Sequence, residues 1–254
     1  MSARLYPDLA GWRAARRSAD WAGCSIGFVP TMGALHEGHR ALLERARREC
    51  GRVVLSVFVN PTQFNDPKDL ERYPRTLESD VALVGEDVDA VLAPPAAELY
   101  PDRYRFRVNE TEFSRELEGA HRPGHFEGVL TVVLKLLNVV DADRAYFGEK
   151  DWQQLALVRG MAEAFFLRTQ IIACPTVRAP DGLALSSRNA RLSPAGRLKA
   201  PEFSRALRSA PSEAAAEEAL RAAGFGVDYV ARRGSVRLGA VHLDGVRLID
   251  NVTL

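Results

Sequence analysis

Two histidines three positions apart, His36 and His39, lie in the segment PTMGALHEGH at residues 30–39. The apolar run SIGFV precedes this segment and an amphipathic run follows it, so the order predicts a strand, a tight turn and the start of a helix. On a helix, this spacing places both imidazoles on one face. Free N–H groups and the positive dipole end at a helix start suit a phosphate, and Gly33 lets the backbone approach it. The pattern therefore predicts imidazoles that bind the phosphate chain of a nucleotide and stabilise charge developing on it during transfer.

Two other interpretations of the histidine pair compete with this one. Histidines near a helix start commonly only cap the helix and pack, and the pair taken alone favours that interpretation. A zinc site of the H-E-x-x-H type is excluded, because the residue four positions after His36 is Arg40 and no third ligand set accompanies the pair.

A second signal far along the chain favours the nucleotide. Residues 185–189 read LSSRN, so the hydroxyls of Ser186 and Ser187 stand before the cation of Arg188 in a predicted loop. Small hydroxyls followed by a cation suit a triphosphate. Two matching segments are stronger evidence than either one alone.

A third segment, GEKDWQQ at residues 148–154, has chemistry of the same kind. Lys150 can meet a phosphate, Asp151 can accept hydrogen bonds from ribose hydroxyls, and Gln154 can hold a carboxylic acid. Charged residues before a helix are commonly only caps and partners of the helix dipole, which is the favoured interpretation of this segment alone. The three segments together reverse that preference.

These segments resemble the signature of adenylate-forming nucleotidyltransferases of the class I synthetase type, in which an HxGH element follows the first strand and a serine/basic loop follows the last. Within that superfamily, PTMGALHEGH, GEKDWQQL and LSSRN are similar to the pantothenate synthetase family. The similarity extends from about residue 26 to 189, with an echo in RLIDN at residues 247–251. Leu185 stands where this family usually has methionine, a change that keeps size and polarity.

The resemblance implies ATP-dependent condensation of (R)-pantoate with β-alanine to pantothenate, AMP and pyrophosphate, through a pantoyl-adenylate and with Mg²⁺. It implies catalytic roles for His36, His39, Lys150 and Arg188, assigns pantoate and β-alanine to Gln63 and Gln154, and assigns no residue to the metal. The residues that it implies for ATP are Met32, Gly33, Ala34, Leu35, His36, Glu37, Gly38, His39, Gly148, Glu149, Lys150, Asp151, Val177, Leu185, Ser186, Ser187 and Arg188.

Two rival functions are weighed against this one. Another small nucleotidyltransferase would act on a phosphorylated acceptor, but the neutral amides of Gln63 and Gln154 suit a hydroxy acid, whereas a phosphate favours cations. A nucleotide sensor or RNA-binding protein is disfavoured by the intact charged motifs and by the balance of 34 Lys and Arg against 33 Asp and Glu. Asn60 precedes Pro61, and that pair is interpreted as a turn start only.

Composition indicates a cytoplasmic protein. The three cysteines, Cys24, Cys50 and Cys174, are widely spaced and form no C-x-x-C pair, as expected of buried thiols in a reducing compartment. No run approaches the roughly 18 apolar residues of a membrane span, so no membrane partner is expected.

The elements that position these motifs follow a β-α-β rhythm. We expect a surface helix at residues 9–21 and then strands at 52–60, 88–93, 145–147 and 169–174, with helices at 76–85, 129–140 and 155–167 between them. This order predicts an α/β fold with a Rossmann-like, doubly wound parallel sheet. The charged residues 66–74 are expected to form a loop that closes over the site.

The segment between the third strand and the long apolar helix is expected to hold a short strand at residues 105–109 and a helix at 111–118. His121 and His125 are interpreted as loop residues, and Arg122 as either a phosphate ligand or a solvated side chain. Residues 129–140 are more apolar than a one-sided surface helix requires. Together with the resemblance, this predicts a homodimer.

Two domains are expected, a nucleotide- and pantoate-binding domain at residues 1–178 and a small α+β lid domain at 179–254. Pro180, Asp181 and Gly182 are interpreted as the hinge. The lid is expected to contain a helix at residues 193–207, another at 215–223 and three strands at 226–232, 235–243 and 246–252. Its length predicts a domain shorter than is usual in the family and a less complete closure.

Overall fold

The computed structural model describes residues 3–65 and 67–254. The chain folds into two compact units. The first consists of the residues up to Leu35 together with His39–Phe147 and Gln154–Cys174. The second consists of His36–Gly38, Gly148–Gln153 and Pro175–Leu254.

The helices and strands are, in chain order, β1 (Arg4–Tyr6), α1 (Leu9–Arg16), β2 (Ile26–Thr31), α2 (Glu37–Glu49), β3 (Arg52–Val57), α3 (Pro67–Glu71), α4 (Leu77–Val84), β4 (Ala90–Leu92), α5 (Ala96–Leu99), α6 (Glu118–His121), α7 (His125–Val140), β5 (Arg144–Gly148), α8 (Trp152–Ala164), β6 (Gln170–Cys174), α9 (Pro194–Lys199), α10 (Pro201–Ser209), α11 (Glu213–Ala222), β7 (Gly226–Arg233), β8 (Val236–Leu243) and β9 (Val246–Thr253). Single 3-10 turns occur at η1 (Ala19–Trp21), η2 (Pro61–Gln63), η3 (Gly85–Asp87), η4 (Phe113–Arg115), η5 (Glu149–Asp151) and η6 (Ser187–Arg191).

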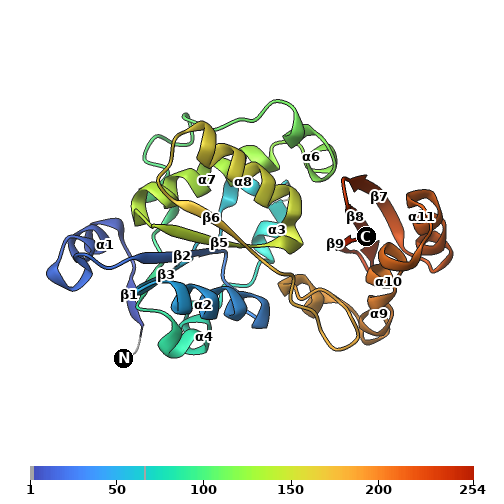
Figure 1. Cartoon of the computed structure of the whole chain (residues 1–254), viewed down its shortest axis with the longest axis horizontal. Coiled ribbons are helices and arrows are strands. Elements are labelled where there is room, and N and C mark those ends of the chain that lie inside the picture. Colours follow the sequence, from blue (N-terminus) through green and yellow to red (C-terminus); the bar gives the residue numbers. More distant parts are fainter. Residues whose placement is uncertain (1–2, 66) are drawn as a thin grey trace. The chain divides into compact units, whose positions relative to one another are not determined.

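The first unit is built on a six-stranded parallel sheet with the strand order β1-β4-β3-β2-β5-β6 (Figure 1). From β2 the chain adds β3 and β4 on one side, and later β5 and β6 on the other. This order confirms the predicted doubly wound sheet, whose switch point lies between β2 and β5. Ligands of such sheets bind outside the carboxyl ends of the strands at the switch point, where the HxGH segment and the GEKD segment begin.

Strand residues alternate between two helical layers. Phe28 and Val54 pack in one apolar cluster with residues of α1, α7 and α8. Val29 and Leu55 pack in another cluster with residues of α2 and α4. Figure 1 shows α7 and α8 on one face of the sheet and α2 and α4 on the other. Burial on both faces explains why these strands read as continuous apolar runs.

The N-terminal segment differs from the single helix expected at residues 9–21. Helix α1 ends at Arg16, and η1 follows after the extended residue Ser18. The indole of Trp12 is fully buried and donates from Nε1 to the carbonyl of Val139 at 2.9 Å, so α1 packs on α7. The edge of the sheet is strand β1, which pairs with β4 and which the sequence pattern did not indicate because it is only three residues long.

The expected strand at residues 105–109 and helix at 111–118 are absent from this described part of the chain. Side chains take the backbone donors that a strand would pair: Phe106 N donates to Asp102 Oδ2 at 2.8 Å, and Val108 N donates to Thr131 Oγ1 at 2.9 Å. The carboxylate of Glu110 likewise accepts from the backbone, and only the turn η4 forms. Local bonds from side chains to the backbone therefore replace both elements.

The interpretation of His121 and His125 as loop residues is wrong, because His121 ends α6 and His125 begins α7. Residues 67–71 are also not a loop but the short helix α3, while Asp66 lies outside the described residues.

Helix α7 is a core helix of the first unit. Its apolar residues, including Val129, Leu130, Leu136 and Leu137, are buried in the same cluster as the sheet. Burial within one chain accounts for their hydrophobicity, so this helix does not support the dimer as the sequence suggested. In the part of the chain that the structure describes, no helix is long and apolar enough to cross a membrane.

The second unit contains the antiparallel sheet β7-β8-β9, and all three of its strands occur where they were expected. Phe203 and Leu207 of α10 and Leu220 of α11 pack on this sheet to form the core. The expected helix at residues 193–207 is two helices, because Pro201 has no N–H to bond within a continuous helix and instead opens α10.

Candidate active site

The turn between β2 and α2 is held by the buried carboxylate of Asp80. Ala34 N donates to its Oδ2 at 3.0 Å and Leu35 N to its Oδ1 at 2.9 Å. Gly33 N donates to Thr31 Oγ1 at 3.2 Å. These three N–H groups therefore bind within the protein. The free N–H groups predicted for a phosphate lie further along the chain, at the start of α2, and they stay a prediction.

Gly33 is required in this turn for two reasons. Its φ of +80° lies in the left-handed region that glycine adopts without strain. A Cβ at this position would also lie 2.9 Å from Asp80 Oδ2 and 3.0 Å from Val57 Cγ1. Glycine at this position therefore lets Asp80 pack closely against the turn, and the predicted approach to a ligand stays a prediction.

His36 lies one residue before the start of α2. The prediction that His36 and His39 lie together on one face of a helix is therefore wrong. Its Nδ1 accepts a hydrogen bond from Gly38 N at 3.1 Å. Burial, followed by the nearby charge of Lys150, lowers the pKa of the imidazole below its usual 6.5. His36 is therefore neutral at pH 7 with its hydrogen on Nε2, which can donate to a phosphate oxygen.

The ring of His36 also explains the glycine of the HxGH motif. A Cβ on Gly38 would lie 2.8 Å from His36 Cε1 and 2.9 Å from Nδ1. Any other residue at this position would push the imidazole out of its place. His39 lies in the first turn of α2, where the positive dipole end of the helix favours anions.

The turn η5, which follows β5, presents Lys150. The lysine side chain is largely buried, and its Nζ lies 3.9 Å from Asp151 Oδ1. The side-chain amide of Asn251 donates to the carbonyls of Glu149 and Lys150 at 2.8 and 3.0 Å. Strand β9 thus holds the backbone of the GEKD segment within the second unit.

The LSSRN segment forms the turn η6, capped by Ser186. The Ser186 hydroxyl accepts from Arg188 N at 3.3 Å, and Asn189 Nδ2 donates to Ala184 O at 2.9 Å. Leu185 N donates to Val177 O at 3.0 Å, which joins the two predicted nucleotide-binding residues in a hairpin.

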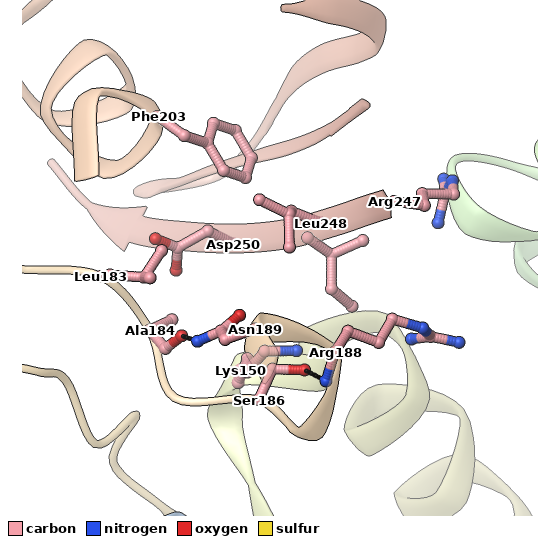
Figure 2. A pocket seen from close by; sticks show the side chains of 11 residues that line it. Lys150, Leu183, Ala184, Ser186, Arg188, Asn189, Phe203, Arg247, Leu248 and Asp250 are labelled. Atoms are coloured by element: carbon pink, nitrogen blue, oxygen red, sulfur yellow. Dashed lines mark hydrogen bonds between the residues drawn. The ribbon is translucent and has the colours of Figure 1, made fainter. Parts of the chain in front are cut away.

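Lys150 and the LSSRN segment line one pocket of the second unit. Figure 2 shows Lys150 beside Ser186 and Arg188, beneath strand β9. The structure therefore brings together the GEKD lysine and the serine–arginine loop. The remaining lining residues are Leu183, Ala184, Asn189, Phe203, Arg247, Leu248, Ile249 and Asp250. In residues 3–65 and 67–254, no group of three or more His, Cys, Asp or Glu side chains is placed to hold a metal ion.

Gln63 lies in the first unit at the end of η2, and Asn60 fixes its side chain. Asn60 Nδ2 donates to Gln63 Oε1 at 3.0 Å and to Gly128 O at 3.2 Å, while its Oδ1 accepts from Tyr100 at 2.7 Å. Asn60 is only 1% exposed. It caps η2, as an Asn-Pro turn predicts, but the interpretation as a turn start alone is incomplete. With its oxygen engaged, the Gln63 amide offers its NH₂ group as a donor.

The backbone of Gln63 is held as well. His125 Nδ1 lies 2.9 Å from its carbonyl oxygen, and Arg122 donates to the same oxygen at 3.3 Å. The partly exposed side chain of Arg122 therefore helps to hold this turn, and a contact with phosphate stays a prediction. Gln154 is a half-buried residue in the first turn of α8 and belongs to the first unit, as Gln63 does.

Sequence reasoning missed Asp80 and Asn251 and undervalued Asn60. Asp80 reads as an ordinary polar residue of a surface helix, and no local pattern links it to a turn 46 positions away. Asn251 lies in the RLIDN segment, for which the resemblance implies no role.

A doubly wound sheet with an HxGH turn at its switch point, a lysine turn and a serine–arginine loop defines an α/β enzyme of the adenylate-forming type. Comparisons with known proteins specify the family. The model of the pantoate-β-alanine ligase family matches residues 5–253. The chain belongs to this family.

Relatives match over nearly the whole chain. A pantothenate synthetase of Bdellovibrio bacteriovorus is 55% identical over 91% of this chain and 92% of its own length. A solved pantothenate synthetase of Thermus thermophilus has a TM-score of 0.91 and 45% identity, over 98% of this chain and 99% of that one. A pantoate-β-alanine ligase of Francisella tularensis, solved with β-γ ATP and β-alanine, has a TM-score of 0.94 and 38% identity, over 99% and 97%.

Proposed function

We propose that this protein condenses pantoate with β-alanine to pantothenate, with ATP cleaved to AMP and pyrophosphate, in the route to coenzyme A. In the first step a carboxylate oxygen of pantoate attacks the α-phosphorus, and the bond from that phosphorus to pyrophosphate breaks. In the second step the β-alanine amine attacks the acyl carbon of the pantoyl-adenylate. The bond to AMP breaks, and the amine loses a proton.

The nucleotide is assigned to the HxGH, GEKD and LSSR segments. Lys150 and Arg188, which line one pocket with Ser186, offset the negative charge of the phosphates. The neutral His36 donates from Nε2, and His39 acts at the start of α2. No covalent intermediate with the protein is involved. The rate enhancement comes from positioning and from donors aimed at charge that grows in the transition state.

The observation that carries the choice of acceptor is the bond from Asn60 to the amide oxygen of Gln63. It leaves Gln63 as an uncharged donor, which suits the hydroxyl and carboxylate oxygens of pantoate. Gln154 is assigned to the same acid. A nucleotidyltransferase with a phosphorylated acceptor would favour cations at these positions.

Magnesium is proposed as part of the nucleotide substrate. Mg²⁺ keeps several waters and is usually bound through substrate phosphates with one or two carboxylates. Bound to ATP, it would neutralise charge on the leaving pyrophosphate.

The assembly is also part of the proposal. Residues 1–178 would serve as the nucleotide- and pantoate-binding domain. Residues 179–254 would serve as a lid that closes during the reaction and excludes water from the adenylate. Because Asn251 binds the backbone of Glu149 and Lys150, the GEKD turn would move with this lid. We expect a homodimer in the cytoplasm.

One assay tests the proposed function. AMP release is measured with ATP and Mg²⁺, with pantoate and β-alanine each present or absent. Rapid AMP release should require both acids and should yield pantothenate in equal amount. Equal AMP release without pantoate, or a faster reaction with a phosphorylated acceptor, would exclude this function.

A further inference from the structure

The RLIDN segment joins the two nucleotide-binding segments of the second unit. Its last residue, Asn251, donates from Nδ2 to the carbonyls of Glu149 and Lys150, at 2.8 and 3.0 Å. Both N–H groups of this side-chain amide therefore donate to the turn that presents Lys150. The proposed mechanism gives this residue no role.

Asn251 is itself held by an ion pair. The carboxylate of Asp250, whose side chain is 2% exposed, binds Arg178 with both oxygens, at 2.7 Å to Nη1 and 2.9 Å to Nη2. Arg178 Nη2 also donates to Asn251 O at 2.9 Å, and Asn251 N donates to Asp250 Oδ1 at 2.8 Å. A bidentate arginine–carboxylate pair has a defined geometry. Arg178 therefore holds the carbonyl of Asn251, and Asp250 holds its N–H.

Arg178 connects this cluster to the serine–arginine loop. It forms an isolated antiparallel bridge with Ala184, and the hairpin continues with the bond from Leu185 N to Val177 O. Arg178 Nη1 also donates to Gly182 O at the tip of the hairpin, at 3.0 Å. The arm that ends in Ser186 and Arg188 is therefore tied to the same ion pair.

We propose that Asn251 is a positioning residue for Lys150, and that the Arg178–Asp250 pair fixes Asn251 relative to the Ser186–Arg188 loop. The lysine ammonium is a point charge on a flexible stem, so its place beside the phosphates depends on where the backbone of η5 is fixed. The three residues act as one clamp that sets the spacing between the two segments on the nucleotide. This inference rests on the proposed function, because it assigns its purpose to the adenylation step.

A double-mutant cycle tests whether Asn251 acts through Lys150. The rate measured is pantoate-dependent exchange of labelled pyrophosphate into ATP, in the wild type, Asn251→Ala, Lys150→Ala and the double variant. Asn251→Ala should lower the exchange rate roughly 10- to 100-fold, as expected for two lost hydrogen bonds. In the Lys150→Ala background the same change should cost less than about 3-fold, because residues that act as a unit are not additive.

Each outcome has one meaning. A wild-type protein without exchange would overturn the proposed function before any variant is compared. Exchange in Asn251→Ala equal to the wild type, or an equal loss in both backgrounds, would overturn only the positioning role. Asn251→Ser keeps one hydroxyl donor and should recover part of the rate. If Asn251→Ala does not fold, Asn251→Ser takes its place in the cycle. If exchange by Lys150→Ala is too slow to measure, the cycle is built instead from the dissociation constants for ATP of the same four proteins, measured by calorimetry.

The pKa of His36 gives a measure of the position of Lys150 that does not depend on enzyme activity. The charge of Lys150 contributes to its lowered pKa, whereas Asp151 and Glu37 raise it. If Asn251→Ala lets Lys150 move away, an NMR titration of His36 should show its pKa rising toward 6.5. An unchanged titration in a variant that has lost exchange would mean that Asn251 only supports the fold, and would overturn the proposal.

The ion pair has a matched control in the same unit. Asp250→Asn should lower exchange by weakening the hold on Asn251. Glu213→Gln makes the same acid-to-amide change at another arginine, Arg237, which binds Glu213 at 3.0 Å. Arg237 also donates to the carbonyls of Leu207 and Ala210, which lie outside the clamp. We expect the control to keep wild-type exchange even where both variants unfold at a lower temperature. An equal loss of exchange in both variants would contradict the clamp.

Discussion

Asp80 binds the backbone of Ala34 across 46 positions of sequence, with its Oδ2 accepting from Ala34 N at 3.0 Å. Its other oxygen accepts from Leu35 N, and Thr76 Oγ1 donates to Oδ2 at 3.1 Å. The carboxylate is buried, so these donors replace the water that it would otherwise bind. A helix on one face of the sheet thereby fixes the turn that leads into the HxGH motif.

Asp80→Asn should destabilise this turn. One amide oxygen can still accept a single N–H, but the NH₂ group would face the other donor. Hydrogen bonds to a charged group contribute about 1.5–3 kcal/mol, so we expect a loss of about 2 kcal/mol in the free energy of unfolding, together with slower AMP formation. Denaturant unfolding and the AMP assay measure the two effects. Glu78→Gln changes an exposed acid of the same helix and should leave both unchanged. Equal behaviour of the two variants would refute the role of Asp80.

The sheet was predictable because its strands are buried on both faces. Runs such as residues 52–57 are apolar and β-branched, and the order of strands and helices allows few topologies. The HxGH and LSSR segments were predictable because glycine, histidine and serine–arginine patterns reflect local backbone and charge. Local patterns therefore predicted the scaffold, and they indicated the candidate nucleotide-binding segments.

The contacts that hold those motifs were not predictable in the same way. Asp80 to Ala34 and Asn251 to Lys150 are bonds between distant segments, and a single acid or amide in the sequence does not identify its partner. The predictions for the segment between β4 and α7 were wrong for a related reason. Polar side chains such as Asp102 and Glu110 bind backbone N–H groups there, which overrides the strand and helix preferences of their neighbours.

Gly128→Ala should weaken the use of pantoate by displacing the turn that carries Gln63. A Cβ on Gly128 of α7 would lie 2.4 Å from Thr62 O and 2.8 Å from Gln63 N, closer than real contacts allow. Because both are backbone atoms, η2 must shift. We expect a rise of about 10-fold or more in the KM for pantoate and a loss of about 1–3 kcal/mol in stability, typical of overpacking.

Gly160→Ala is the matched control for Gly128→Ala. Gly160 lies in α8, and an added Cβ would meet nothing within 4 Å. Alanine is the better helix former, so this variant should gain about 0.5–1 kcal/mol in stability and keep the wild-type KM for pantoate. A similar rise in KM for both variants would contradict the packing argument.

Gln63→Ala and Gln154→Ala should each weaken pantoate binding and leave ATP binding almost intact, because both amides are assigned only to the acid. A lost hydrogen bond of about 1 kcal/mol corresponds to roughly a 5-fold higher dissociation constant for pantoate. Calorimetry with each ligand measures this, and Gln170→Ala, at the exposed first residue of β6, should behave as the wild type. An equal loss of both ligands would mean that the two glutamines support the fold instead.

Because of His36, the free energy of unfolding and the rate of adenylation should both decrease as the pH falls below about 6.5. Burial, followed by the charge of Lys150, lowers its pKa in the folded protein, so the unfolded chain binds a proton more readily. Its contribution to stability is therefore complete above about 6.5, the usual pKa of histidine, and is lost as the pH falls through the lower folded-state value. Protonation also removes the lone pair of Nδ1 that accepts from Gly38 N.

His36→Asn separates this titration from the rest of the protein, because an asparagine oxygen can accept from Gly38 N at any pH. Between pH 7.5 and 5.5 the free energy of unfolding should fall more steeply in the wild type than in His36→Asn, as measured by denaturant unfolding at each pH. Pyrophosphate exchange at pH 7.5 should be about 10-fold or more slower in the variant, since removal of one aligned donor costs at least that much in comparable sites. His121→Asn, at an exposed histidine, should keep the wild-type pH dependence. A stability difference between the wild type and His36→Asn that stays constant across this range would mean that the pKa of the half-buried His36 is not lowered in the folded protein.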